Sequence, residues 1–289
     1  MEVETPALSA VAATDPYLDS FQTVYQGPLA PAGLPLYLQT SPEYHMKRLL
    51  AAGSGPIYQL GKAYRNAEAG SRHNPEFTML EWYRPGFDHL ALMDEVAELV
   101  AMILATPQVH RISYQALFID AIAIDPFACC MENLQRCLAE RGIQLPEMPG
   151  ANLDDWLGLA MSHLIEPVMG PDPLMVYDFP ASQAMLARVR DGEPSVAERF
   201  ELYVNGIELA NGFHELSDAN EQRRRFEDNI AQRRALALPP LALDTALLDA
   251  LQAGLPDAAG VALGVDRLVM LAAGADSLNE VMAFPLDRA

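Results

Sequence analysis

The alternation of apolar and polar positions predicts two strands early in the chain. Residues 56–66 fit one strand, residues 76–84 fit a second that is rich in aromatic side chains, and the polar stretch 67–75 joins them. We therefore expect a long antiparallel hairpin. Ahead of it, the prolines and glycines between Gly27 and Pro35 predict a loop between two extended pieces.

Helical periodicity begins after this hairpin. Asp88 is a suitable N-cap, and apolar residues recur at helical spacing from Leu92 until Pro107. Further helical patterns cover residues 131–141 and 152–169, with the proline- and glycine-containing segment 146–150 between them. We expect residues of about 106–170 to form a helical insertion.

The last third of the chain returns to strands. Residues 199–204 and 207–211 flank Asn205-Gly206, a pair that tolerates positive φ at both central positions and predicts a two-residue antiparallel hairpin. Residues 217–234 and 244–253 fit helices, and a strand at 261–265 leads into a helix at 266–273. The pattern predicts an α+β fold, an antiparallel sheet flanked by helices, in one domain over residues 1–289.

Composition narrows the class of protein. With 289 residues, 51% of them hydrophobic and 20% charged, the chain is expected to be globular. Its net charge of −20 opposes a broad nucleic-acid footprint, although a local basic patch is compatible with it. There is neither an apolar run of about 18 residues, as a membrane span needs, nor a signal-peptide pattern. The three cysteines, Cys129, Cys130 and Cys137, match neither zinc nor disulfide spacing, which favours a reduced, cytoplasmic setting.

The first hairpin carries candidate chemistry. Strand parity places on one face an aromatic ring, a thioether, a carboxylate and a phenol, those of Phe77, Met79, Glu81 and Tyr83. Arg65 closes the preceding strand, and Arg72 and His73 lie in the connecting loop. This set suits a nucleotide and an amine. A half-buried strand beside a solvated loop is the alternative interpretation.

The second hairpin is unusually acidic for strands. Glu201, Glu208, Asn211 and Glu215 lie on or beside it, although acidic residues are depleted in strands. They are suited to act as oxygen ligands for magnesium on nucleotide phosphates, with a remaining carboxylate for a substrate ammonium. A solvated sheet face is the alternative.

A strand of small residues forms the third candidate feature. Gly260, Ala262 and Gly264 leave one strand face almost bare, so a flat ligand can lie against it. Arg267 starts the next helix, where its guanidinium can stack on a base while its charge faces a phosphate. Close packing of a helix would also explain the small residues.

In this order, an arginine-bearing hairpin followed by a small-residue strand ending in arginine resembles motifs 2 and 3 of the class II aminoacyl-tRNA synthetases. Residues 65–66 (RN), 73–81 (HNPEFTMLE) and 208–215 (ELANGFHE) are similar to the lysyl branch, and residues 2–6 (EVETP) resemble the end of motif 1. The resemblance covers essentially the whole chain. It implies a class II catalytic core in which the motif 1 helix is largely missing.

The resemblance implies a nucleotide site in which Arg65 binds the α-phosphate and Phe77 and Arg267 enclose the adenine. His73 would contact the outer phosphates, and Asn74 belongs to the same ATP-binding set. Arg65 and Arg267 would be the catalytic residues. No general base is needed, because the substrate carboxylate itself attacks the α-phosphorus and catalysis rests on positioning and charge neutralisation.

The resemblance also implies a metal site and an amino-acid pocket. Magnesium would be held by Glu201 and Glu208. The distal ammonium of a lysine-like substrate would meet Glu215 and Tyr83, its carboxylate would lie near Asn211, and its other amine near Glu43 and Glu81. The rest of the pocket would be lined by Ser41 and Ala262.

Within the lysyl branch, residues 40–48 (TSPEYHMKR) and 81–85 (EWYRP) resemble the paralogues that modify elongation factor P. The acidity and the lack of an anticodon-reading β-barrel ahead of motif 1 agree with this. The resemblance implies a cytoplasmic, homodimeric ligase using ATP and Mg²⁺. It would activate (R)-β-lysine as an adenylate and transfer it to a lysine ε-amine of elongation factor P, without tRNA or membrane. Cations near the site would dock this acceptor: Lys47, Arg48, Arg72 and Arg84.

Two departures leave other functions open. Ala67 occupies the place of the motif 2 glutamate, with Glu68 after it, and the chain begins after most of the motif 1 helix. A truncated lysyl-tRNA synthetase acting on tRNA and a non-catalytic synthetase-like regulator are the alternatives. An asparagine synthetase of this class would need a pocket for aspartate, which the carboxylates Glu43, Glu81 and Glu215 would repel.

Overall fold

The chain folds into two compact units, Met1–Gly86 with Ser217–Ala289, and Phe87–Leu216. A computed structural model describes residues 1–106, 108–148 and 150–289. Pro107 and Pro149, at which the sequence predicts the end of a helix and a break between helices, lie outside the described residues. Within these ranges, no helix combines the length and the apolar character needed to cross a bilayer.

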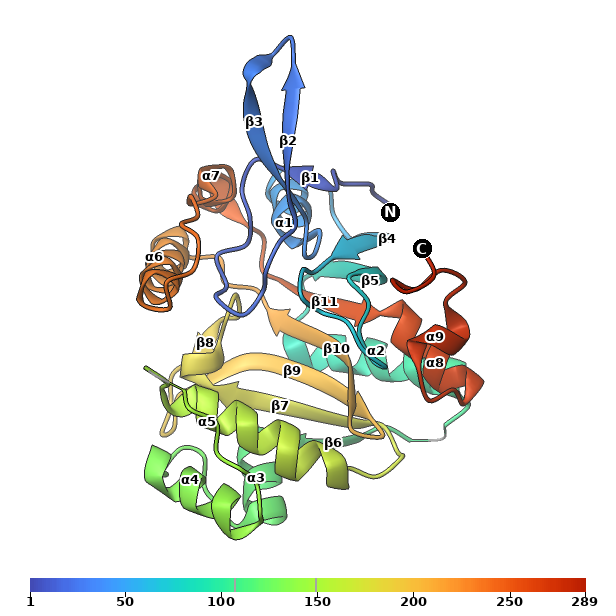
Figure 1. Cartoon of the computed structure of the whole chain (residues 1–289), viewed down its shortest axis with the longest axis vertical. Helices are drawn as coiled ribbons and strands as arrows, with labels where there is room; N and C mark the ends of the chain where they lie inside the picture. The colour runs from blue at the N-terminus through green and yellow to red at the C-terminus, as the bar shows by residue number, and fades with distance from the viewer. Residues whose placement is uncertain (107, 149) are drawn as a thin grey trace. The chain divides into compact units, whose positions relative to one another are not determined.

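The first unit is built on an antiparallel sheet with the strand order β4-β5-β11. Its strands are β4 (Ile57–Tyr64), β5 (Glu76–Pro85) and β11 (Ala258–Gly264) (Figure 1). The predicted hairpin is thereby confirmed. The helices of this unit are α1 (Glu43–Ala51), α6 (Ala219–Ala235), α7 (Thr245–Gly254), α8 (Val265–Ala273) and α9 (Leu278–Val281).

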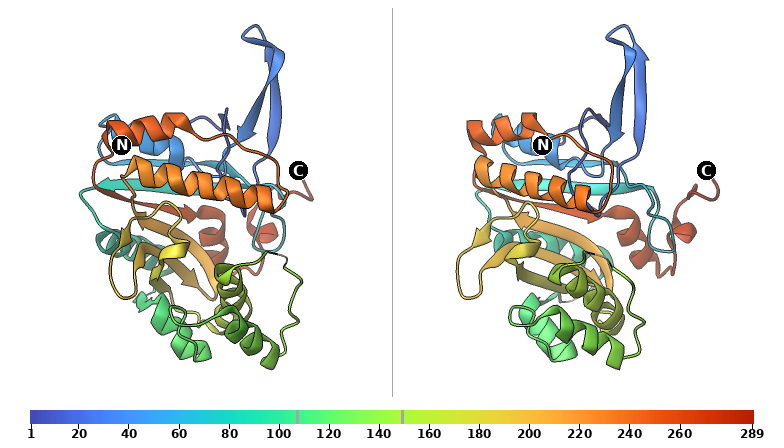
Figure 2. Two further views of the ribbon diagram at one scale, coloured as in Figure 1. Left: turned by 90° about the vertical axis from the view of Figure 1, so that its left-hand side faces the viewer. Right: turned by 60° about the vertical axis from the view of Figure 1, so that its left-hand side comes forward.

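A small ribbon extends this unit. It consists of β1 (Leu8–Ser9), β2 (Gln22–Gly27) and β3 (Ala30–Leu38), and both views of Figure 2 show the β2–β3 hairpin projecting away from α6 and α7. The loop predicted between Gly27 and Pro35 is wrong in extent, because only Pro28 and Leu29 form the turn. Pro31 and Pro35 have the same parity in β3, and proline is tolerated where its missing N–H faces away from the partner strand.

The second unit contains strands in the order β10-β9-β7-β6, with β8 beside β9. They are β6 (His110–Ser113), β7 (Leu174–Pro180), β8 (Val189–Arg190), β9 (Val196–Val204) and β10 (Ile207–His214). Asn205 and Gly206 have φ values of 52° and 66°, so the predicted two-residue turn is confirmed. A Cβ on Gly206 would lie 2.2 Å from the carbonyl oxygen of Glu166, which leaves room only for glycine.

The helices of the second unit differ in part from the predictions. They are α2 (His89–Leu104), α3 (Tyr114–Ile122), α4 (Met131–Glu140), α5 (Leu153–Ala160) and the short turns Met161–Ile165, Glu166–Val168 and Ala181–Gln183. Asp88 caps α2 as predicted, accepting a hydrogen bond from the Ala91 amide. The helical pattern predicted over 152–169 is confirmed, although the helix changes type, because α5 is followed by a π turn and a 3₁₀ turn.

The segment expected to be helical also contains β6, which pairs in parallel with β7. Four residues are too few for a period of two to stand out in a sequence. A buried core connects the strands with α3, α4 and α5, and within it the Tyr114 ring centroid lies 4.5 Å from that of Phe118 and 4.8 Å from that of Phe179. This hydrophobic cluster is what holds the insertion together.

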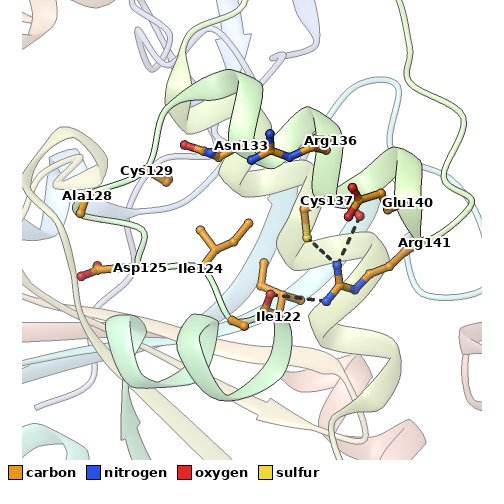
Figure 3. Close-up of a pocket in the computed structure, with 11 residues that line it drawn as sticks. Ile122, Ile124, Asp125, Ala128, Cys129, Asn133, Arg136, Cys137, Glu140 and Arg141 are labelled. Atoms are coloured by element: carbon orange, nitrogen blue, oxygen red, sulfur yellow. Dashed lines mark hydrogen bonds between the residues drawn. The ribbon is translucent and has the colours of Figure 1, made fainter.

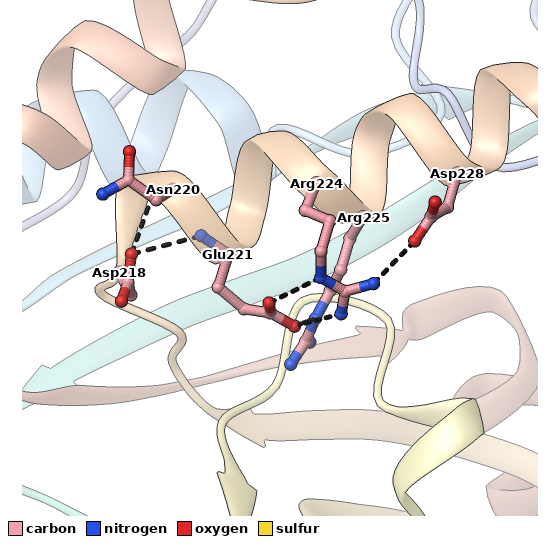
Figure 4. Close-up of polar contacts among 6 residues, drawn as sticks. All are labelled: Asp218, Asn220, Glu221, Arg224, Arg225 and Asp228. Carbon is pink, nitrogen blue, oxygen red and sulfur yellow. Dashed lines mark hydrogen bonds and ion pairs between the residues drawn. The ribbon is translucent and has the colours of Figure 1, made fainter.

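Helix α6 is stabilised by charge at its amino-terminal end (Figure 4). The Asp218 carboxylate accepts hydrogen bonds from the amides of Asn220 and Glu221. Glu221 in turn receives the guanidinium groups of Arg224 and Arg225 at 2.7 and 2.8 Å. The hydrogen bond from Arg224 comes first among the causes that lower the pKa of Glu221 to about 2.

We predict that Glu221→Gln lowers the free energy of unfolding at pH 7 by about 0.5–1 kcal/mol, the usual range for an exposed ion pair. Because the pKa is depressed in the folded state, this stabilisation is present above the unfolded pKa of about 4.3 and is lost as the pH falls toward 2. Urea unfolding of wild type and variant at pH 7 and near pH 2 measures this stabilisation. Glu227→Gln, on the same helix, is the matched control and should have no measurable effect at either pH. An equal loss for both variants would contradict the ion-pair account.

Candidate active site

One face of the first unit's sheet brings a carboxylate and small residues together. In register, Glu81 of β5 lies between Gln59 of β4 and Ala262 of β11, and Tyr83 lies opposite Gly260. Residues opposite one another on antiparallel strands project to the same side. The bare face predicted for β11 is therefore continuous with the face that carries Glu81 and Tyr83.

Glu81 and Tyr83 form a buried pair. Each is only 2% exposed, and the Tyr83 hydroxyl donates a hydrogen bond to Glu81 Oε1 at 2.7 Å. Burying a carboxylate costs free energy unless donors or cations satisfy it. Such a carboxylate selects a cationic group over a neutral one.

Cations gather around His73, in the loop just ahead of β5. Arg267, at the start of α8, places Nη2 2.7 Å from His73 Nε2, and its Nε donates to the Arg72 carbonyl at 3.1 Å. Burial, followed by the charge of Arg267, lowers the pKa of His73. A neutral His73 accepts the hydrogen bond from Arg267, so the cluster presents several donors and a positive charge to an anion.

Arg65 extends this cluster toward an aromatic ring. Its guanidinium carbon lies 5.2 Å from the centroid of Phe77, within cation–π range. Its Nη1 is 4.0 Å from Glu68 Oε1. Glu68 thus lies beside the arginine, although the motif 2 glutamate itself is replaced by Ala67. Arg65 Nε is buried without a hydrogen-bond partner among the described residues, and an anion placed here would satisfy it.

Other predicted residues of this unit already have structural partners. Asn74 donates to the Glu76 carbonyl at 2.6 Å and accepts from the Leu286 amide at 2.9 Å. Glu43, which follows Ser41 at the start of α1, binds Lys47 Nζ at 2.7 Å. Lys47 is 1% exposed, so its prediction as a docking cation is wrong: a buried, paired ammonium cannot meet a protein partner.

The second unit presents a second acidic site. Arg199 Nη2 and the Tyr203 hydroxyl donate to the two oxygens of Glu201, and Arg199 Nε donates to Asn211 Oδ1 at 3.3 Å. Asn211 and Glu201 are also partners in the β9–β10 register. The predictions missed Arg199 and Tyr203, although their shared parity with Glu201 along one strand places all three side chains on one face.

Burial raises the pKa of Glu201; Arg199 opposes the shift, and the negative charge of Glu208 adds to it. Two carboxylates that repel each other in this way are a suitable donor set for a divalent cation, which would relieve the repulsion. Glu215, just beyond β10, is 2% exposed and forms a backbone bridge with Ala187. The second unit thus holds Glu201, Glu208, Asn211 and Glu215, and the first unit holds the remaining predicted site residues.

Comparison with known proteins identifies the family. The family model described as "tRNA synthetases class II (D, K and N)" matches residues 1–288. The chain belongs to this class II synthetase family.

Curated members of the class II synthetase family are similar over the full chain. A protein of Yersinia enterocolitica is 53% identical over 290 residues, covering 100% of this chain and 89% of its own length. Proteins of Vibrio cholerae and Vibrio atlanticus are 51% and 50% identical, each covering 100% of this chain and 90% of its own length. All three are called "Elongation factor P--(R)-beta-lysine ligase".

This class II synthetase chain also has a cavity of about 490 Å³ between the end of α3 and α4 (Figure 3). Arg141 lines it, donating to Cys137 Sγ at 2.8 Å and to the Ile122 carbonyl at 3.4 Å. None of the predicted site residues is among the described residues that line this cavity. The three cysteines of this region are free thiols.

We predict that Glu201→Gln destabilises the protein by about 1–3 kcal/mol near pH 5, because the amide NH₂ replaces one of the two oxygens that accept hydrogen bonds from Arg199 and Tyr203. The difference in the free energy of unfolding between wild type and variant should become smaller as the pH rises from about 5 to about 8. A raised folded pKa gives stability that is complete below the unfolded pKa and is lost as the pH rises through the folded value. Urea unfolding across this range tests the sign, and a gap that widens with pH would refute the assignment.

Proposed function

We propose that this chain is an ATP-dependent elongation factor P (R)-β-lysine ligase. It forms an aminoacyl adenylate from (R)-β-lysine and passes the acyl group to a lysine ε-amine of elongation factor P, without tRNA. The observation that carries the proposal is the buried Glu81–Tyr83 pair beside the bare strand face at Ala262, in the same unit as the cations around His73. The names of the full-length relatives support the same activity.

Activation needs an anion site and an amine site, and the first unit supplies groups suited to each. Arg65 binds the α-phosphate of ATP, His73 and Asn74 assist at the outer phosphates, and Phe77 and Arg267 enclose the adenine. The carboxylate oxygen of (R)-β-lysine attacks the α-phosphorus, the bond to the bridging oxygen breaks, and pyrophosphate leaves. Positioning and neutralisation of charge supply the catalysis, as in other phosphoryl and nucleotidyl transfers.

The acidic side chains have distinct roles in this proposal. Glu201 and Glu208 would hold Mg²⁺, which neutralises phosphate charge when bound. Glu215 and Tyr83 receive the side-chain ammonium, and Asn211 lies near the carboxylate. The other amine meets Glu81 and Glu43, with Ser41 lining the pocket.

Transfer completes the reaction. The ε-amine of the acceptor lysine attacks the carbonyl carbon of the adenylate, AMP leaves, and an amide forms with release of a proton. Exposed Arg48 and Arg72 are available to dock the acceptor, with partly exposed Arg84. We further infer that the protein is a cytoplasmic homodimer. Residues 1–289 would form one catalytic domain, with a helical insertion at about residues 106–170.

An exchange assay tests catalysis and substrate together. We expect the purified chain to exchange pyrophosphate into ATP with (R)-β-lysine more efficiently than with α-lysine, and not with aspartate. It should then acylate elongation factor P and leave lysine tRNA uncharged. Efficient charging of tRNA would favour the truncated synthetase, and absence of exchange in a folded protein would favour a regulator.

Ala262 is expected to tune the choice between the two lysines. Its methyl lies opposite Glu81 on the bare face, and one methyl in a tight pocket discriminates by roughly 1–3 kcal/mol. Ala262→Gly should raise kcat/KM for α-lysine relative to (R)-β-lysine. Ala259→Gly, on the other face of the same strand, is the control and should leave the ratio unchanged. A ratio that stays constant in Ala262→Gly would show that the methyl only packs.

A further inference from the structure

Two histidines and a carboxylate meet inside the second unit, and none of the three has a role in the proposed ligase reaction. The candidate ligand atoms of His89, Glu198 and His214 all lie within 4.8 Å of one another. His89 begins α2, whereas Glu198 and His214 come from β9 and β10. By strand parity, Glu198 faces away from Glu201, so this cluster lies on the opposite side of β9 from the acidic site.

His89 is the unexplained member of the cluster. Its side chain is 2% exposed, and neither ring nitrogen has a hydrogen-bond partner among the described residues. It is directed into the cluster, since its ring stacks against His214 with centroids 6.5 Å apart and its Nε2 lies 3.6 Å from Asp178 Oδ1. An imidazole buried without a hydrogen bond costs free energy that a ligand would recover.

Carboxylates make the surroundings favourable to a cation. Glu198 Oε2 shares a hydrogen bond of 2.6 Å with His214 Nδ1, and Asp178 stands beside His89. Arg190 contacts both carboxylates, at 2.6 Å for Asp178 and 3.3 Å for Glu198. One guanidinium does not balance two carboxylates, so negative charge remains beside the two histidines.

We propose that His89, Glu198 and His214 bind a divalent transition-metal ion of the zinc class, with Asp178 or water as the fourth ligand. Imidazole and carboxylate suit zinc in tetrahedral geometry. Metal–ligand lengths of about 2.0–2.2 Å place ligand atoms roughly 3.3 Å apart, so the widest separation, which is at most 4.8 Å, must shorten by up to about 1.5 Å. The ion replaces the proton shared by Glu198 and His214, and Arg190, 45% exposed, turns toward solvent.

The site has the character of a structural clamp. Both histidines are buried, which leaves little access for a reacting molecule. The ion would tie the first turn of α2 to the central strands of its unit, and the fold of the first unit has no part in it. This inference therefore stands or falls separately from the proposed ligase activity.

Zinc binding to the purified full chain tests the proposal. After chelation and removal of any affinity tag, Zn²⁺ titrated in excess Mg²⁺ should bind at one ion per chain and raise the Tm by ~5 °C when well above its Kd. His89→Gln should weaken binding at least ~10-fold, the lower bound for disturbing a metal's surroundings. Glu198→Gln, which keeps an acceptor for His214, should do the same if His89→Gln proves unstable.

Two controls separate this cluster from other zinc ligands. His110→Gln alters an exposed histidine of the same unit, and a chain with Cys129→Ser, Cys130→Ser and Cys137→Ser lacks every thiol. Both should bind zinc as the wild type does, and the Co²⁺ derivative should show no thiolate charge-transfer band. Absence of stoichiometric zinc in the wild type, or unchanged binding in folded His89→Gln and Glu198→Gln, would overturn the proposal.

Discussion

The antiparallel register of β5 against β4 and β11 is the constraint on which the first unit's chemistry depends. It places Glu81 between Gln59 and Ala262, and Tyr83 beside Gly260. A slip of one residue would turn every side chain to the opposite face and bury Trp82 where Glu81 now lies. The small residues of β11 therefore place no large side chain beside Glu81 and Tyr83, as the proposed amino-acid pocket requires.

In the second unit, the corresponding constraint is the cost of burying charge. Glu201 is tolerated in a buried strand because Arg199 and Tyr203 donate hydrogen bonds to its two oxygens. The negative charge of Glu208 opposes ionisation of Glu201 and so helps to raise its pKa. On the opposite side of β9, Glu198 is matched to His214 and Arg190. One strand thus carries separate polar networks on its two faces, and each network restricts the register as strictly as a hydrophobic face would.

Local signals predicted the features that depend on local physics. The Asn205-Gly206 turn, the Asp88 cap of α2 and the parity of Glu81 and Tyr83 all follow from backbone preference or strand alternation. Strand β6, the change of helix type after Ala160 and the burial of Lys47 depend on partners distant in sequence, so no window around them contains the information. For the same reason, the convergence of His89, Asp178 and His214 was invisible in the sequence. The ligand roles of the site residues rest on resemblance and are not derivable from spacing.

The β2–β3 ribbon has a consequence for the behaviour of the protein in solution. It exposes apolar side chains, with Leu29 93% and Leu34 43% accessible, on a two-stranded element. The unpaired backbone at the edge of an exposed strand can pair with a strand of another chain. Pro31 and Pro35 remove amide donors from one side of β3, so an incoming strand finds an interrupted ladder. The ribbon can therefore expose apolar side chains for contacts with another molecule while resisting the backbone pairing that leads to aggregation.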